Sequence, residues 1–258
     1  MLEIKNVTKV FHIGTPNEKI ALKNLNLTLE DGDFATVIGG NGAGKSTLMN
    51  IISGSLRPDA GKIVVDGTDI TSLNEWKRAK YFGRVFQDPL IGTAANMQLE
   101  ENLALSAKRG ERRGLKFGIT AQERAHYQEL LKMLDLGLES RLKTKVGLLS
   151  GGQRQALTLL MATLHQPKVL LLDEHTAALD PKTSLKVLTL TDQIVEKNHL
   201  TTLMFTHNMK DALRYGNRLI MMNDGKIVLD VRGEEKAQLT VADLLERFGN
   251  GLSDRMLL

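Results

Sequence analysis

The sequence contains no cysteine, and no apolar run in it approaches the roughly 20 residues that a membrane-spanning helix requires. Its longest apolar runs, such as residues 169–172, have the length of a strand and stop at charged residues. Residues 1–4 enter an alternating pattern at once, without the basic and apolar regions of a signal peptide. The absence of cysteine permits a reducing compartment without proving one. We therefore expect a cytoplasmic chain that does not cross a bilayer by itself.

The sequence also lacks internal repeats, low-complexity linkers and a strong excess of charge. The formal net charge of the 258-residue chain is +4, which is too small to indicate a nucleic-acid surface. One short stretch is basic, and a solvated loop explains it better than a contact with lipid headgroups or an acidic partner. It contains Lys108, Arg109, Arg112, Arg113 and Lys116, and we assign it no site. The length favours one large α/β unit over two independent domains.

Two kinds of strand are expected. Residues 1–11, 25–29 and 63–70 alternate or carry Asp-Gly turn signals, which is typical of short antiparallel strands near the N-terminus. Residues 34–38, 169–172 and 203–206 are mainly apolar, as expected of central parallel strands covered on both faces. We expect an α/β fold with a parallel core sheet and an N-terminal antiparallel β layer.

A helical pattern occupies residues 89–165, between the strand-rich parts of the chain. Within it, Thr120 and Glu123 have the spacing of a capping box at the start of a helix. Near the end of the chain, Asn223-Asp224-Gly225 predicts a hairpin, and residues 241–248 predict a short amphipathic helix. We therefore expect an inserted helical lobe.

Residues 39–47 match the pattern G-x-x-x-x-G-K-[ST], between a predicted strand and a helical pattern, as this phosphate-binding P-loop requires. Its glycines let backbone N–H groups turn toward one centre, and the helix that follows adds its positive end. A turn that merely joins strand to helix does not need lysine and serine at these offsets. Lys45 is expected to reach the β and γ phosphates, and the Ser46 hydroxyl to bind Mg²⁺ in preference to Thr47. The expected cradle is Gly39, Asn41, Gly42, Ala43, Gly44, Lys45, Ser46 and Thr47.

A second motif, Leu149-Ser150-Gly151-Gly152-Gln153, stands before a helix whose apolar face follows helical spacing. Ser150 and Gln153 also have the spacing of a capping box, so a capped helix is the simpler explanation. Two glycines in a first turn reduce helix propensity, however, and we expect no packing reason for them. The pattern favours close approach of the backbone to a ligand such as a phosphate.

With these motifs the sequence resembles the ABC ATPase family, whose signature is LSGGQ, over nearly the whole chain. The resemblance implies a P-loop NTPase fold, ATP and Mg²⁺ as cofactors, and ATP hydrolysis. It implies a single domain over residues 1–258, with a nucleotide-binding core at 1–88 and 166–258 and the signature-bearing lobe at 89–165. In this family the signature of one subunit faces the γ-phosphate held by the other, so Ser150, Gly151, Gly152 and Gln153 are expected to act in trans.

Residues 168–174 form a buried strand pattern that ends in two carboxylates, and ligands of open α/β sheets bind beyond such strand ends. By the resemblance to the Walker B motif, Asp173 is expected to help hold Mg²⁺ through a water molecule, and Glu174 to polarise the water that attacks the γ-phosphate. A structural ion pair is the alternative, although two adjacent acids after an apolar run are a costly way to form one.

Four further residues match family motifs. Gln87 matches the Q-loop glutamine that contacts the metal or the attacking water, and His207 matches the switch histidine at the γ-phosphate. Asp180 matches the D-loop at the dimer interface, although it also precedes Pro181 as a helix cap does. Phe11 matches the aromatic that stacks on adenine, and core packing is its alternative.

The resemblance also implies partners. We expect a second ATP-binding subunit, with a second copy of this chain as the expected partner, and membrane permease subunits that hold the pair at the cytoplasmic face of the cell membrane. The family usually has Pro-Thr-Ser after the catalytic glutamate, whereas this chain has His175-Thr176-Ala177. Residues 173–181, Asp-Glu-His-Thr-Ala-Ala-Leu-Asp-Pro, resemble a small subgroup that works with a separate permease and a substrate-binding lipoprotein in amino-acid uptake.

The expected function is therefore to energise solute transport across a membrane, with import favoured. The alternative is a soluble ABC ATPase that acts on nucleic acid or ribosomes. Such members typically add a second cassette, a long coiled coil or a metal cluster, and this chain shows none of these patterns. Export stays open, because a partner chain mainly sets the direction of transport.

Overall fold

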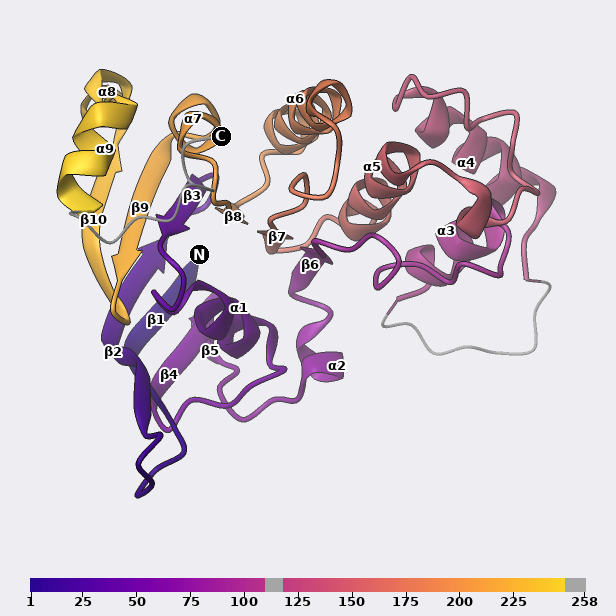
Figure 1. Cartoon of the computed structure of the whole chain (residues 1–258). Helices are drawn as coiled ribbons and strands as arrows, with labels where there is room; N and C mark the ends of the chain where they lie inside the picture. Colours follow the sequence, from indigo (N-terminus) through magenta and orange to yellow (C-terminus); the bar gives the residue numbers. More distant parts are fainter. Residues whose placement is uncertain (110–117, 249–258) are drawn as a thin grey trace.

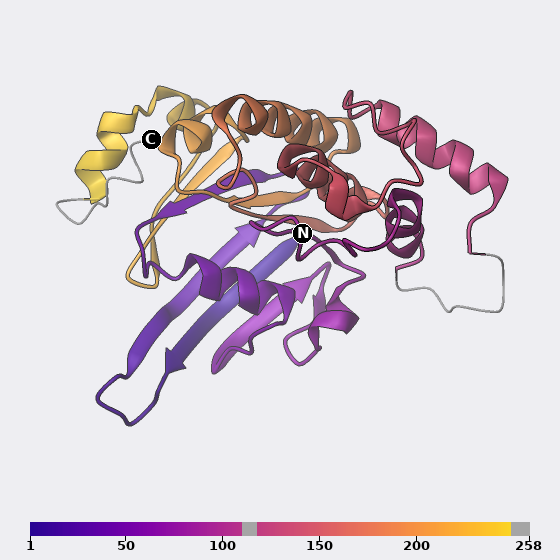
Figure 2. The same ribbon diagram turned by 45° about the vertical axis from the view of Figure 1, so that its right-hand side comes forward.

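The computed structural model describes residues 1–109 and 118–248, which form two β-sheets and a helical lobe (Figures 1 and 2). Three of the basic residues considered above, Arg112, Arg113 and Lys116, lie outside the described residues. Within the described part of the chain, no helix combines the length and apolar character needed to cross a membrane.

The first sheet is the expected antiparallel layer, with strand order β2-β1-β4-β5. All of its pairings are antiparallel. The second strand starts at Lys19, before the predicted residue 25, because Lys19, Ile20 and Leu22 pair with the end of β1. The strands are β1 (Leu2–Phe11), β2 (Lys19–Leu29), β4 (Ala60–Val65) and β5 (Thr68–Asp69).

The second sheet contains the three predicted core strands side by side. Its order is β10-β9-β3-β8-β7-β6, and only the β9–β10 hairpin is antiparallel. Side chains of β3 and β8 are buried throughout, as expected of strands covered on both faces. The strands are β3 (Phe34–Gly39), β6 (Phe82–Val85), β7 (Val169–Asp173), β8 (Thr202–Phe205), β9 (Arg218–Asn223) and β10 (Lys226–Arg232).

Helix α1 (Lys45–Ser53) lies between the two sheets, and its Leu48 and Ile52 share one apolar core with both of them. The C-terminal end of α1 is held by the fully buried Arg78, at the end of α2 (Glu75–Arg78). Its guanidinium donates to the carbonyl oxygens of Ile51 at 2.6 Å and Ile52 at 2.9 Å. A cation at this helix end complements the helix dipole.

The other face of the second sheet is covered by helices, and the lobe extends from it (Figure 1). Helix α4 begins at the predicted capping box, in which Thr120 accepts from the Glu123 N–H. The lobe has its own apolar core, and its boundaries at residues 89 and 165 stay predictions. The helices are α3 (Leu99–Ala107), α4 (Ala121–Lys132), the 3-10 helix Val146–Leu148, α5 (Gly151–Thr163), α6 (Pro181–Asn198), α7 (Met209–Arg214), α8 (Gly233–Gln238) and α9 (Val241–Phe248).

Candidate functional site

The candidate site lies beyond the carboxyl ends of four neighbouring parallel strands, β3, β8, β7 and β6. The segments that leave these strands carry, in the same order, the P-loop, His207, Glu174 and Gln87. Because parallel strands end at the same edge, residues distant in the sequence meet there. Together they line a cavity of about 1000 Å³.

The P-loop backbone is packed too tightly for side chains at two of its glycines. A Cβ atom on Gly39 would lie 2.5 Å from the Met222 carbonyl oxygen, and one on Gly44 would lie 2.6 Å from the Ala21 carbonyl oxygen. Gly42 and Gly44 also have φ values of +80° and +101°, where L-residues are strained. The glycines are therefore required by the loop's conformation as well as by any ligand.

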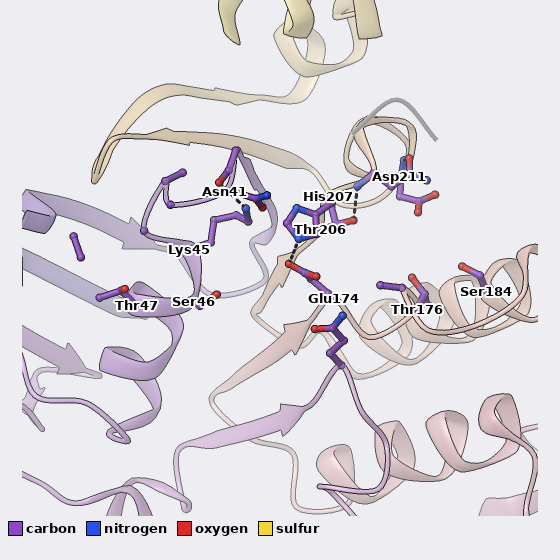
Figure 3. Close-up of a pocket in the computed structure, with 18 of the residues that line it drawn as sticks. Asn41, Lys45, Ser46, Thr47, Glu174, Thr176, Ser184, Thr206, His207 and Asp211 are labelled. Atoms are coloured by element: carbon purple, nitrogen blue, oxygen red, sulfur yellow. Dashed lines mark hydrogen bonds and ion pairs between the residues drawn. The ribbon is translucent and has the colours of Figure 1, made fainter. Parts of the chain in front are cut away.

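Lys45 is the first residue of α1, and its side chain lies along the inside of the loop (Figure 3). The ammonium donates to the Gly39 carbonyl at 2.5 Å and to the Gly40 carbonyl at 3.3 Å. Burial lowers the pKa of Lys45, while the nearby Glu174 opposes that shift. Ser46 and Thr47 follow on the same helix and also line the cavity.

Glu174 and His207 face each other across the ends of β7 and β8 (Figure 3). His207 Nε2 lies 2.5 Å from Glu174 Oε1. Glu174 adopts φ +44°, a left-handed conformation that is uncommon for glutamate, and its N–H donates to the Phe205 carbonyl on β8 at 3.0 Å. The backbone turn therefore points the carboxylate into the cavity beside the P-loop.

Asp173 does not line the cavity directly and instead contacts a cation from the neighbouring strand β6. Arg84 Nη2 lies 3.3 Å from Asp173 Oδ2 and 3.1 Å from the Asn50 side-chain oxygen on α1. Burial raises the pKa of Asp173, and the Arg84 charge partly opposes that rise. The guanidinium also stacks over the Phe86 ring, with its central carbon 4.5 Å from the ring centroid.

Gln87 lines the cavity at the point where the chain leaves β6 for the lobe. The preceding Phe86 carbonyl accepts from Gln155 Nε2 at 3.1 Å, and Gln155 is fully buried on α5. Sequence analysis missed Gln155, because a glutamine inside a helical pattern gives no local signal. This bond connects the Gln87 segment to the helix that follows the signature motif.

The signature residues cap α5, as the spacing predicted. Ser150 accepts from the Gln153 N–H at 3.2 Å, and Gln153 Oε1 accepts from the Ser150 N–H at 3.2 Å. The expectation that the two glycines lack a packing reason was wrong for Gly152, because a Cβ there would lie 2.1 Å from Thr183 Cγ2 on α6. Gly151 is exposed.

The structure places most of the predicted site residues around the cavity, and the others lie away from its lining. Phe11, Asn41, Gly42, Ala43, Gly44, Lys45, Ser46, Thr47, Gln87, Glu174 and His207 line the cavity. Gly39, Asp173, Asp180 and the signature residues 150–153 do not line it. Asp180 is the N-cap of α6 and accepts from the Thr183 N–H at 3.1 Å.

Several lining residues were missed by the sequence analysis. The sequence analysis assigned them no role at the site, and they include Lys19, Ala21, Thr176, Thr206, Asn208 and Asp211. Burial raises the pKa of Asp211, with Arg214 and Lys210 opposing the rise.

His175 occupies the position at which the sequence departs from the family pattern, and it is buried. Its Nε2 lies 3.0 Å from the Thr191 hydroxyl, which donates to the Val187 carbonyl at 2.8 Å. The hydroxyl therefore accepts, and His175 carries its proton on Nε2. Burial lowers the pKa of His175 from 6.5 to about 4.

Comparison with known proteins places these features in one family. The profile of the ABC transporter family matches residues 22–177, which is more than half of the chain. The tyrosine transport ATP-binding protein of Clostridioides difficile is 51% identical over 250 residues, which cover 96% of this chain and 98% of that protein. The methionine import ATP-binding protein MetN 2 of Oceanobacillus iheyensis is 35% identical, with 88% of this chain and 64% of that protein covered.

A solved structure with the same fold is a dimeric ATP-binding cassette in a post-hydrolysis state, bound to ADP and Pi. It is 32% identical to this chain, with a TM-score of 0.76 and coverage of 90% of this chain and 98% of that one.

The buried His175 predicts a pH dependence of stability. Because the folded pKa lies below the value of 6.5, the unfolded chain binds the proton more tightly, and stability is lost as the pH falls from above 6.5 through about 4. The loss from this residue is about 3 kcal/mol. His175→Gln, which keeps a donor toward Thr191 but does not titrate, should lose less of its unfolding free energy over this range in denaturant titrations.

The exposed His126 supplies a control, since His126→Gln should follow the unaltered chain. Parallel pH profiles for His175→Gln and the unaltered chain would contradict the assignment.

Proposed function

The chain belongs to the ABC transporter family, and we propose that its P-loop, Glu174 and His207 form one half of the site at which a transporter hydrolyses ATP. As a member of this family the chain is an ATP-binding and ATP-hydrolysing subunit that energises solute transport across a membrane. The observation that carries the assignment of residues is the Glu174–His207 pair at 2.5 Å, beside the P-loop in one cavity.

The residues divide the chemistry between them. The P-loop N–H groups and Lys45 hold the β and γ phosphates, and Phe11 at the mouth of the cavity stacks on adenine. Glu174 polarises the water that attacks the γ-phosphate, and His207 holds Glu174 in place and contacts the γ-phosphate. These groups are oriented before the reaction begins, so they can stabilise the charge that develops at the γ-phosphate in the transition state.

The oxygen donors near the P-loop fit Mg²⁺. The Ser46 hydroxyl and the Gln87 amide line the cavity and would hold it directly. Asp173, which does not line the cavity and contacts Arg84, would help to hold it through a water molecule. The described residues contain no group of three or more His, Cys, Asp or Glu side chains placed to hold a metal ion. In nucleotide sites Mg²⁺ usually shares its shell with phosphate oxygens and water. When bound, Mg²⁺ would neutralise part of the phosphate charge.

A second copy of the chain completes each site. The signature residues 150–153 lie outside the cavity, although a capped helix N-terminus with an exposed glycine is suited to phosphate binding. A two-fold dimer would place each signature on the opposite P-loop, with the Asp180 loops between the two sites. The dimeric cassette at 32% identity supports this arrangement.

The permease is proposed to dock in a second cavity of about 600 Å³, which lies between the core and the lobe. Trp76 from the core side and Ile91 and Leu105 from the lobe side line it, and Trp76 is 71% exposed. An exposed tryptophan beside further apolar side chains is typical of a protein-binding surface. Arg84 and Phe86 line the same groove, so it adjoins the segment that leads to Gln87.

The solute is proposed to be an amino acid, and the 51% identity to a tyrosine transport protein points to tyrosine. Import is favoured by the likeness to a methionine import protein, and a substrate-binding protein would deliver the solute. The subunit would then be held by the permease at the cytoplasmic face of the membrane. The transporter names of these relatives favour this interpretation over action on nucleic acid or ribosomes.

Glu174→Gln tests the catalytic assignment. The variant should bind ATP with nearly unchanged affinity but lose roughly 100-fold or more of its turnover, because the amide cannot polarise the water. Phosphate release by the complex with its permease measures turnover, and uptake of labelled tyrosine by cells that carry the variant should be lost as well. Near-normal hydrolysis would remove Glu174 from the mechanism.

A mixed dimer tests the composite sites. Lys45→Ala and Ser150→Arg chains, each inactive alone, are combined so that one site carries both changes and the other carries none. About half of the mixture is then the mixed dimer, and partial ATPase activity should return. Full activity from diluted monomers of the unaltered chain would refute the shared sites.

Trp76→Ala tests the docking groove. The variant should keep its basal ATPase activity and bind the permease roughly 10-fold or more weakly in a pull-down titration, because an aromatic anchor is lost. Val228→Ala is the control, because Val228 on β10 is another exposed apolar residue, at 52%, and does not line the groove. Equal permease affinity for the two variants would place the docking site elsewhere.

A further inference from the structure

Lys19 lines the nucleotide cavity, although no motif includes it. It is the first residue of β2 and pairs directly with Phe11, the last residue of β1. Both residues line the cavity. A Cβ atom built on Gly42 of the P-loop would lie 3.1 Å from Lys19 Nζ. The ammonium group therefore lies directly over the P-loop backbone.

The backbone of β2 holds Lys19 in this place. Residues 19 and 21 of a strand point to the same face, and the Ala21 carbonyl touches both the P-loop and the β9–β10 turn, leaving no space for a Cβ on Gly44 or Gly225. Hydrogen bonds join the same segments, from the Lys23 N–H to the Gly225 carbonyl at 2.9 Å and from the Gly225 N–H to the Ala43 carbonyl at 3.1 Å. The position of the strand relative to the P-loop is thus fixed by backbone packing.

The neighbouring lysines differ from Lys19 in their charge partners. Lys9 forms an ion pair with Asp59 at 2.8 Å, and Lys23 pairs with Asp224. Within the described ranges Lys19 forms no ion pair with a carboxylate, although its charge acts on the pKa of Asp224. Its charge is available to a ligand in the cavity.

We propose that Lys19 is a second phosphate-binding cation, which contacts the α and β phosphates of the nucleotide. The inference rests on the proposed function, because the γ-phosphate must lie beside Glu174 and His207. Lys45 lies near Glu174, whose charge acts to raise the pKa of Lys45. Lys19 lies on the side of Phe11, between the adenine and the P-loop. The two lysines therefore bind the phosphate chain at different points.

This position defines which nucleotides depend on Lys19. ATP and ADP both carry the α and β phosphates, so the Lys19 charge should raise the affinity of the protein for both nucleotides by the same factor. Adenosine contacts Phe11 but has no phosphate, so Lys19 should not change the affinity of the protein for adenosine. A lysine that served only the γ-phosphate would favour ATP over ADP.

Calorimetric titration of the full-length chain with ATP, ADP and adenosine tests the proposal. Lys19→Gln should weaken ATP and ADP by a similar factor of roughly 10, the value of one charge-assisted contact, and leave adenosine unchanged. Lys19→Arg should retain nearly full affinity. Lys5→Gln is the matched control, because it removes an exposed lysine from the same sheet and should change none of the three affinities.

Unchanged ATP and ADP affinities in Lys19→Gln would overturn the proposal. Loss of ATP affinity alone would overturn the assignment to the α and β phosphates, and an equal loss for adenosine would show that the variant disturbs Phe11 instead. Absence of ATP binding by the unaltered chain would overturn the proposed function itself, and with it this inference.

Discussion

Close backbone contacts around the P-loop determine how the parts of the core fit together. A Cβ atom on Gly39 would lie 2.5 Å from the Met222 carbonyl oxygen, and Cβ atoms on Gly44 and Gly225 would lie 2.6 Å and 2.7 Å from the Ala21 carbonyl oxygen. Three strands from two sheets thus meet at one loop without intervening side chains. The glycines allow this contact, and the contact gives the phosphate-binding backbone a fixed shape before any ligand arrives.

Two arginines connect α1, the helix that follows that loop, to the rest of the core. Arg78 donates to carbonyl oxygens at the end of α1, including Ile51 and Ile52, and so satisfies groups that a helix end leaves open. Arg84 joins Asp173 to Asn50 of α1 and stands on the wall of the groove between core and lobe. A movement of Arg84 in that groove would therefore act directly on Asp173, because one side chain contacts both.

A hydrogen bond from α5 of the lobe joins the lobe to the core beside Gln87. Gln155 on α5 donates to the Phe86 carbonyl, immediately before Gln87, and Gly152 at the start of α5 packs closely on Thr183 of α6. Helix α5 therefore links the signature motif, the Gln87 segment and α6. A movement of α5 would therefore act on all three, which suits a subunit that converts nucleotide state into motion of a partner.

The sequence by itself determined the motifs whose residues are close in the chain, such as the P-loop with Lys45 and the two carboxylates at the end of β7. It also determined the two sheet types, because alternation and continuous apolar runs are local patterns. Only the tertiary structure decided that β3, β8 and β7 are neighbours, which brings His207 to Glu174. It alone placed Lys19 over the P-loop and gave Gly152 a packing partner in Thr183, because such contacts depend on strand order and helix packing, which local spacing does not record.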